Sequence, residues 1–144
     1  MGSAALTGLG IALAKPEYQV LVITGDGEQL MGLSGLATIG VQNPANLSVV
    51  VMDNGHYGET GMQQSHTAAA VDLAAIAAAC GFARAELIQD AAGVENLAAN
   101  LFDSRGASFS CIRVEARNLP RSIPVLDGSY IKNRFRSFLG YPPC

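Results

Sequence analysis

The stretch that decides the fold is residues 20–61, VLVITGDGEQLMGLSGLATIGVQNPANLSVVVMDNGHYGETG. It contains two apolar, β-branched runs, and each of them ends in a polar cluster. The tripeptide GDG at 25–27 follows the first run, and DNG at 53–55 follows the second. Short continuous apolar runs of this kind are typical of strands in a parallel sheet. Because parallel strands end at one edge, where α/β proteins bind ligands, we expect Asp26 and Asn54 to lie close together.

The rest of the chain continues the alternation of strands and helices. We expect strands at 19–24, 47–52, 85–89 and 108–116, the first two buried on both faces, and helices at 4–14, 29–41, 71–82, 91–106 and 128–139. This order predicts an α/β fold, a three-layer sandwich with a mostly parallel sheet. A polar loop at 53–70 is longer than most loops in compact domains, so it is the first place to look for a functional site.

Composition excludes several classes of protein. The 144 residues suffice for one domain, and no apolar run reaches the roughly 18 residues of a membrane span. No signal peptide is recognisable. Three widely spaced cysteines, Cys80, Cys111 and Cys144, predict reduced thiols in a cytoplasmic protein rather than a disulfide frame or a zinc site.

Charge is distributed unevenly along the chain. Residues 1–112 carry three cations and ten acids, a net charge of −7, whereas residues 113–144 carry six cations and two acids, a net charge of +4. The acidic chain as a whole argues against nucleic acid as a partner. We interpret about 116–144 as a C-terminal extension of the single domain, a docking or solvated segment.

The two polar clusters supply the ligands of one particular kind of site. A carboxylate, an amide oxygen and a main-chain carbonyl form the oxygen-only set that suits Mg²⁺, which usually shares its coordination with phosphates. Gly25 and Gly27 allow the backbone to approach a phosphate, and the following helix offers free N–H groups. GDG or DNG alone is an ordinary turn. Their combination with two buried strands predicts a metal-bridged diphosphate site.

The spacing of these clusters resembles a known signature. GDG at 25–27, then the 25 residues 28–52, then Asp53-Asn54 is similar to the thiamine diphosphate motif, GDG followed by about 25 to 30 residues and NN. Asp53 departs from the first Asn, which alters the hydrogen bonding around the site, and Asn54 keeps the matching metal-binding position. The string DNGHYGETGMQ further resembles the small subunits of sulfopyruvate and phosphonopyruvate decarboxylases. The likeness covers residues 1 to about 115.

The resemblance implies a cofactor, a metal and the residues that hold them. Thiamine diphosphate would be bound by Gly25, Gly27 and the backbone around Glu28, with the loop at Tyr57 and Gly58 closing over it. Mg²⁺ would be bound by the side chains of Asp26 and Asn54 and by the carbonyl of His56. Met1 falls where family members carry an apolar residue that props the bent cofactor. If Met1 is that residue, the family's preceding strand and helix are missing and the domain is truncated. Otherwise Met1 is only the initiator.

The resemblance also implies a partner. In the family, the Glu that activates the cofactor lies on a separate pyrimidine-binding domain, and neither Glu28 nor Glu59 replaces it. We therefore expect a decarboxylase subunit for a small 2-oxo acid, inactive without a pyrimidine-binding subunit and assembled as a homo- or hetero-oligomer. We expect the helix at 128–139 to contribute to that assembly, with Phe135 and Phe138 buried.

Other polar residues allow two interpretations each. His66 is either a proton-transfer group or a solvated loop histidine. Gln63, Gln64 and Thr67 are candidates for contact with an anionic substrate group. Cys80 is interpreted as core.

Three alternatives to the decarboxylase remain. An acetolactate-synthase-like carboligase uses the same cofactor half, and a non-catalytic cofactor-binding module would keep the fold without a partner. A nucleotide-binding domain is the weaker competitor, because GDG is not GxGxxG and no GxxxxGK[ST] occurs.

Overall fold

The computed structural model describes all residues except 118, 119, 121 and 144, so Cys144 and parts of the predicted C-terminal extension lie outside the described residues. The helices are α1 (Ala4–Ala14), α2 (Asp26–Met31), α3 (Gly35–Gln42), η1 (His66–Ala68), α4 (Leu73–Ala79), α5 (Ala91–Ala99) and α6 (Gly128–Phe138). The strands are β1 (Val20–Gly25), β2 (Leu47–Asp53), β3 (His56–Tyr57), β4 (Gln63–Gln64), β5 (Arg84–Ile88) and β6 (Ser108–Arg113).

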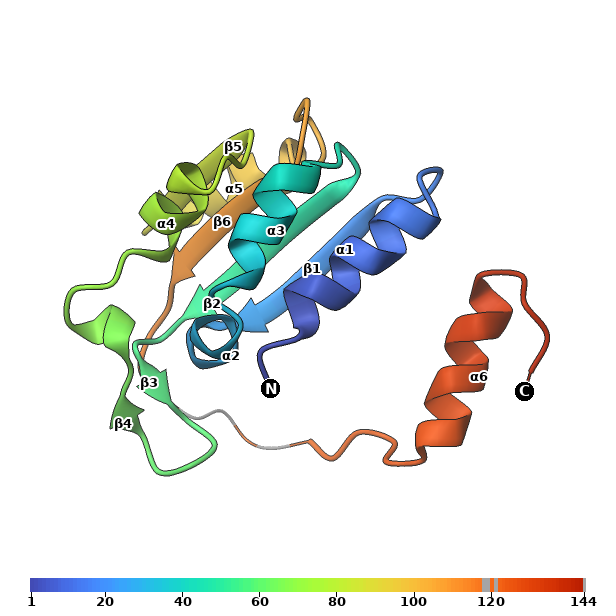
Figure 1. Ribbon diagram of the computed structural model, residues 1–144. Helices are drawn as coiled ribbons and strands as arrows, with labels where there is room; N and C mark the ends of the chain where they lie inside the picture. The colour runs from blue at the N-terminus through green and yellow to red at the C-terminus, as the bar shows by residue number, and fades with distance from the viewer. Residues whose placement is uncertain (118–119, 121, 144) are drawn as a thin grey trace.

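A four-stranded parallel sheet organises the molecule, in the order β1-β2-β6-β5 (Figure 1). Gly25 pairs with Met52, and Asp53 pairs with Arg113, so the carboxyl ends of three strands meet at one edge. The predicted parallel α/β fold is confirmed. So is the placement of the two polar clusters at one end of the sheet.

Helices cover the sheet on both sides, which gives three layers (Figure 1). Helices α1, α3 and α4 cover one face and enclose the main core, which includes Leu36, Val49 and Phe109. Helix α5 covers the other face, where a smaller cluster forms around Leu97, Ile88 and Ile112. Burying such side chains contributes about 1.5–3 kcal/mol each.

Strand β1 differs from the prediction of burial on both faces. Val20 and Val22 are buried against α1, whereas Leu21 and Ile23 on the opposite face are 41% and 66% exposed. On that face helix α5 lies over β5 and β6, and no described helix covers β1. Strand β2, by contrast, is buried along nearly its whole length, as predicted.

The predicted helix at 29–41 is wrong, because the chain forms two helices there. Helix α2 begins directly after β1 and ends at Met31, and α3 starts at Gly35. At the break the backbone of Gly32 passes against that of Gly2, and a Cβ on Gly32 would lie 2.1 Å from the Gly2 oxygen. This contact between segments 30 residues apart leaves no trace in local periodicity.

Other boundaries also move. The predicted loop at 53–70 contains the antiparallel pair β3–β4 and the helical turn η1, and Asp53 belongs to β2. The fourth predicted helix ends at Ala99 and the last strand at Arg113. Cys80 and Cys111 are free thiols. Among the described residues, no helix is long and apolar enough to cross a membrane.

Helix α6 stands apart from the sandwich (Figure 1). The predicted helix is present, and Asp127 accepts hydrogen bonds from the backbone N–H groups of Ser129 and Tyr130 at its start. Its apolar residues are not buried, since Phe138 is 70% exposed. The ring of Phe138 lies 6.0 Å from that of Tyr18, which connects the helix to the α1–β1 turn.

Candidate cofactor and metal site

The strand-to-helix turn of the GDG tripeptide places Asp26 at the carboxyl edge of the sheet. Gly25 ends β1, and Asp26 is already the first residue of α2, with 3% of its surface exposed. A helix of six residues has a small dipole, so the backbone of this turn offers a phosphate less than a long helix would. The carboxylate is therefore the principal charged group of the turn.

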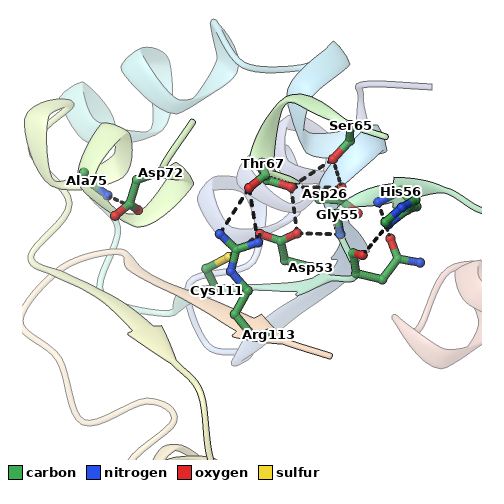
Figure 2. Close-up of polar contacts among 11 residues, drawn as sticks. Asp26, Asp53, Gly55, His56, Ser65, Thr67, Asp72, Ala75, Cys111 and Arg113 are labelled. Carbon is green, nitrogen blue, oxygen red and sulfur yellow. Dashed lines mark hydrogen bonds and ion pairs between the residues drawn. The ribbon is translucent and has the colours of Figure 1, made fainter. Parts of the chain in front are cut away.

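Two hydroxyl groups from the loop hold this carboxylate (Figure 2). Ser65 Oγ donates to Asp26 Oδ2, and Thr67 Oγ1 lies 3.2 Å from the same oxygen. Both side chains are almost fully buried. From the sequence, Ser65 was not predicted to have a role, and Thr67 was a candidate for contact with an anionic substrate group. The latter assignment is wrong, because Thr67 faces carboxylates inside the protein.

Asp53, the residue that departs from the usual motif, is 1% exposed and fully engaged (Figure 2). Its Oδ1 accepts hydrogen bonds from Gly55 N at 2.9 Å and from Thr67 Oγ1 at 2.7 Å. Its Oδ2 forms an ion pair with Arg113 at 2.9 Å and lies 3.5 Å from Cys111 Sγ. Burial, together with the charge of Asp53, raises the pKa of the Cys111 thiol to about 12, so this thiol stays protonated.

Arg113 was not predicted as part of the site. Its guanidinium also donates from both terminal nitrogens to the Thr67 carbonyl, at 3.3 Å each. Arg113 is the last residue of β6, and only the pairing register of β2 and β6 sets it beside Asp53.

The Asn54 side chain is oriented by a local turn. Its Oδ1 accepts a hydrogen bond from His56 N at 2.8 Å, and His56 Nδ1 lies 2.9 Å from the Asn54 carbonyl. Such Asx turns fix a short polar side chain relative to its own backbone. The second lone pair of Oδ1 is left for another donor or a cation.

Tyr57 packs on the glycine turn. A Cβ built on Gly27 would lie 2.7 Å from two ring carbons of Tyr57, so the absence of a side chain at Gly27 allows the aromatic ring to approach α2. Through this contact the segment that follows DNG packs against the GDG turn, and the two form one wall of the site.

Glu28 turns away from that wall and holds the N-terminal segment. Its carboxylate accepts hydrogen bonds from Gly2 N at 2.8 Å, Ala4 N at 3.0 Å and Thr24 Oγ1 at 2.9 Å. Burial alone would raise the pKa of Glu28, but these hydrogen bonds together outweigh it and lower the pKa. The segment that carries Met1 is thereby fixed beside α2.

These elements enclose a cavity of about 460 Å³. It is lined by Met1, Gly25, Asp26, Gly27, Glu28, Met31, Met52, Asn54, His56, Tyr57, Gly58, Glu59 and Thr60. Every residue that the sequence assigned to cofactor or metal lines this one cavity. No lysine or arginine appears among these described lining residues, so the polar part of the wall is acidic or neutral.

Three predicted candidates, His66, Gln63 and Gln64, lie outside the described lining of this cavity, and Gln64 is exposed on β4. His66, in η1, lines a neighbouring hollow with Leu30, Val71 and Tyr57 rather than the main cavity. Gln63 is exposed on β4 and forms hydrogen bonds with Thr60.

The donor set is compatible with a hard divalent cation. Among the described residues no group of three His, Cys, Asp or Glu side chains forms a metal cluster. The expected set, however, has one carboxylate, one amide oxygen and one carbonyl, completed by oxygens of a bound phosphate. A divalent cation would offset the repulsion between a dianionic ligand and the acidic residues that line this cavity.

Comparisons with known proteins agree with this arrangement. Residues 1–113 match the family described as thiamine pyrophosphate enzyme, C-terminal TPP binding domain. A phosphonopyruvate decarboxylase of Streptomyces viridochromogenes is 37% identical over 145 aligned positions, which cover the whole chain and 36% of that protein. A sulfopyruvate decarboxylase subunit beta of Methanothermobacter thermautotrophicus is 37% identical over 94% of the chain and 69% of that subunit.

Solved structures show the same fold. The thiamine diphosphate-dependent 4-hydroxybenzoylformate decarboxylase of Rhodococcus jostii superposes with a TM-score of 0.68 at 17% identity, over 80% of this chain and 23% of that chain. The 2-oxoglutarate:ferredoxin oxidoreductase of Magnetococcus marinus superposes with a TM-score of 0.65 at 19% identity, over 99% of this chain and 61% of that chain. With the match over residues 1–113, the chain belongs to the family of C-terminal TPP-binding domains of thiamine pyrophosphate enzymes.

Proposed function

We propose that the chain is the diphosphate-binding part of a thiamine diphosphate- and Mg²⁺-dependent decarboxylase for a small 2-oxo acid of the sulfopyruvate or phosphonopyruvate type. The relatives that carry these names support the substrate class. The bound cofactor supplies an electron sink for the carbanion left by decarboxylation. This chain's own residues bind and orient the cofactor.

The observation that carries the proposal is the state of Asp26. It is a buried carboxylate whose hydroxyl contacts both fall on Oδ2. Oδ1 is thereby left, within the described part of the chain, for a ligand in the cavity that Asp26 lines. Asp26 and Asn54 with the His56 carbonyl would hold Mg²⁺.

The cofactor would be held by the remaining lining residues. Gly25, Gly27 and the backbone around Glu28 would contact diphosphate, and Tyr57 and Gly58 would close over it. Met1 would support the cofactor from the N-terminal side, since it lines the same cavity. His66 remains a candidate for proton transfer only if the loop moves on binding.

A partner would complete the active site. The described lining of the cavity contains no lysine or arginine, so recognition of an acidic substrate would fall largely to a pyrimidine-binding subunit. Several relatives are named as beta subunits, which supports such a partner. We place the assembly, a homo- or hetero-oligomer, in the cytoplasm, with 116–144 as an extension that contributes to its contacts.

Asp26→Ala tests the metal site. Calorimetric titration of the protein with thiamine diphosphate, in Mg²⁺ and in a chelator, should show metal-dependent binding that the variant loses. Asp90→Ala is the matched control, because Asp90 also follows a strand and caps a helix through Gly93 N but does not line the cavity. Unchanged Mg²⁺-dependent affinity in Asp26→Ala would contradict the proposal.

A further inference from the structure

The four oxygens around Asp26 and Asp53 form a cluster with few protons. Asp26 Oδ2, Ser65 Oγ, Thr67 Oγ1 and Asp53 Oδ1 make four close contacts, of which Ser65–Thr67 is 2.9 Å and Thr67–Asp53 is 2.7 Å. Each hydroxyl has one proton to donate and a carboxylate has none. Two protons therefore serve four contacts.

The distances indicate where the two protons go. Ser65 donates to Asp26, its shortest contact, and Thr67 donates to Asp53, which is closer to it than Asp26. The Thr67 hydroxyl also lies 3.2 Å from Asp26 Oδ2, so Thr67 contacts both carboxylates. Both loop hydroxyls thus meet Asp26 at Oδ2, which fixes the orientation of the carboxylate and leaves Oδ1 for a ligand in the cavity that Asp26 lines.

Thr67 itself is held on its opposite side by Arg113. The guanidinium contacts the Thr67 carbonyl and also pairs with Asp53, the carboxylate to which the Thr67 hydroxyl donates. The neighbouring main chain is fixed as well, since Ser65 N donates to the Gly55 oxygen at 2.8 Å. Thr67 is 4% exposed, so water does not compete for these contacts.

The cluster as a whole carries more negative than positive charge. Asp26 and Asp53 contribute two negative charges and Arg113 one positive charge, and no other described cation contacts them. One negative charge remains next to the cavity. Buried charge of this kind is stable when a counterion accompanies it.

We propose that Thr67, anchored by Arg113, is a positioning residue that turns the Asp26 carboxylate so that one oxygen is presented to the divalent cation of the cofactor. The inference rests on the function proposed above. Thr67 touches neither metal nor cofactor and acts through Asp26. Outer groups that orient a metal ligand commonly change metal affinity by 10- to 100-fold when they are removed.

The experiment is a calorimetric titration of Mg²⁺ into the whole protein, with thiamine diphosphate at a saturating concentration. Thr67→Val keeps the shape of the side chain and removes the hydroxyl, and Mg²⁺ affinity should fall by about 10-fold or more. Thr67→Ser keeps the hydroxyl, so its Mg²⁺ affinity should stay within about 3-fold of the wild type, a smaller change than the roughly 10-fold expected when the hydroxyl is lost. Should Thr67→Val not fold, Thr67→Cys, with its weak donor, should show the same direction of change.

Ser48→Ala separates positioning from stability. It removes a buried hydroxyl that lies 3.0 Å from Ser108 Oγ at the opposite end of the sheet. Its unfolding temperature should fall and its Mg²⁺ affinity should not. A wild type that binds no Mg²⁺ would overturn the proposed function and this inference together. A wild type that binds Mg²⁺, with Thr67→Val binding equally well, would overturn this inference alone.

Discussion

The two ends of the sheet use polar residues in opposite ways. At the amino end two neutral amides serve the backbone: Asn46 Nδ2 donates to three carbonyls, and Asn43 Oδ1 accepts from Ala107 N. At the carboxyl end two buried carboxylates, Asp26 and Asp53, share the hydroxyl of Thr67. Neutral amides suffice to close the fold. Buried carboxylates at the other end add a desolvation cost that stability alone does not explain, which is the mark of a ligand site.

The largest effect is expected from breaking the ion pair at the carboxyl end. Arg113→Met leaves Asp53, which is 1% exposed, without its cation, and should lower the free energy of unfolding by roughly 3 kcal/mol. We take the low end of the range for broken buried pairs because the Arg113 side chain is 36% exposed. Denaturant unfolding at neutral pH measures the change.

The double variant Asp53→Asn/Arg113→Met sharpens the comparison. It removes both charges of the Asp53–Arg113 pair and restores the amide that the usual signature has at this position. It should recover at least half of the stability lost in Arg113→Met. Equal instability of the single and double variants would show that Arg113 contributes through packing rather than through its charge.

A smaller effect is expected at the amino end. Asn46→Ala removes the amide that contacts the Ala12, Lys15 and Tyr18 oxygens, of which the shortest contact is 2.8 Å to Tyr18. The free energy of unfolding should fall by about 1–2 kcal/mol, as for partly buried carbonyls left without a partner. Mg²⁺-dependent cofactor affinity, measured in the same preparation, should stay at the wild-type value. A weakened affinity would mean that the two ends of the sheet are coupled.

The smallest effect is expected for Glu28→Gln. The amide can still accept from Gly2 N and Ala4 N but loses the negative charge, which should cost about 1 kcal/mol. Because the folded-state pKa of Glu28 lies below 4.5, its extra stabilisation is complete above that pH and is lost as the pH falls through the folded pKa. Urea unfolding should therefore show a larger difference from wild type at pH 7 than at pH 3. A difference that persists undiminished at pH 3 would rule out the charge as its cause.

The elements that the sequence predicted best are those set by local pattern. The runs at 20–24 and 47–52 determine two parallel strands, and parallel strands alone bring Asp26 and Asn54 to one edge. The Asp26 partners Ser65 and Thr67 were missed or misassigned because they return from a polar loop whose path depends on its backbone contacts with Gly55. Periodicity carries no information on such a path.

Long-range contacts explain the remaining differences. The division of the helix after Met31 depends on the passage of Gly2, and the open face of β1 depends on which helix covers it. A glycine in a helical pattern signals a close approach, but it does not say which segment approaches. Arg113 could be found only from the register that sets it beside Asp53.

The crossing of Gly2 over Gly32 has a practical consequence for expression and purification. Gly2 has a φ of 91° and no space for a side chain against the Met31 backbone, and Glu28 holds its N–H. Met1, which is 84% exposed, is thereby attached to a fixed point beside the cavity that it lines. An affinity tag joined directly to Met1 would begin at the mouth of that cavity. Recombinant protein for ligand titrations is therefore better tagged beyond α6, or freed of its N-terminal tag before use.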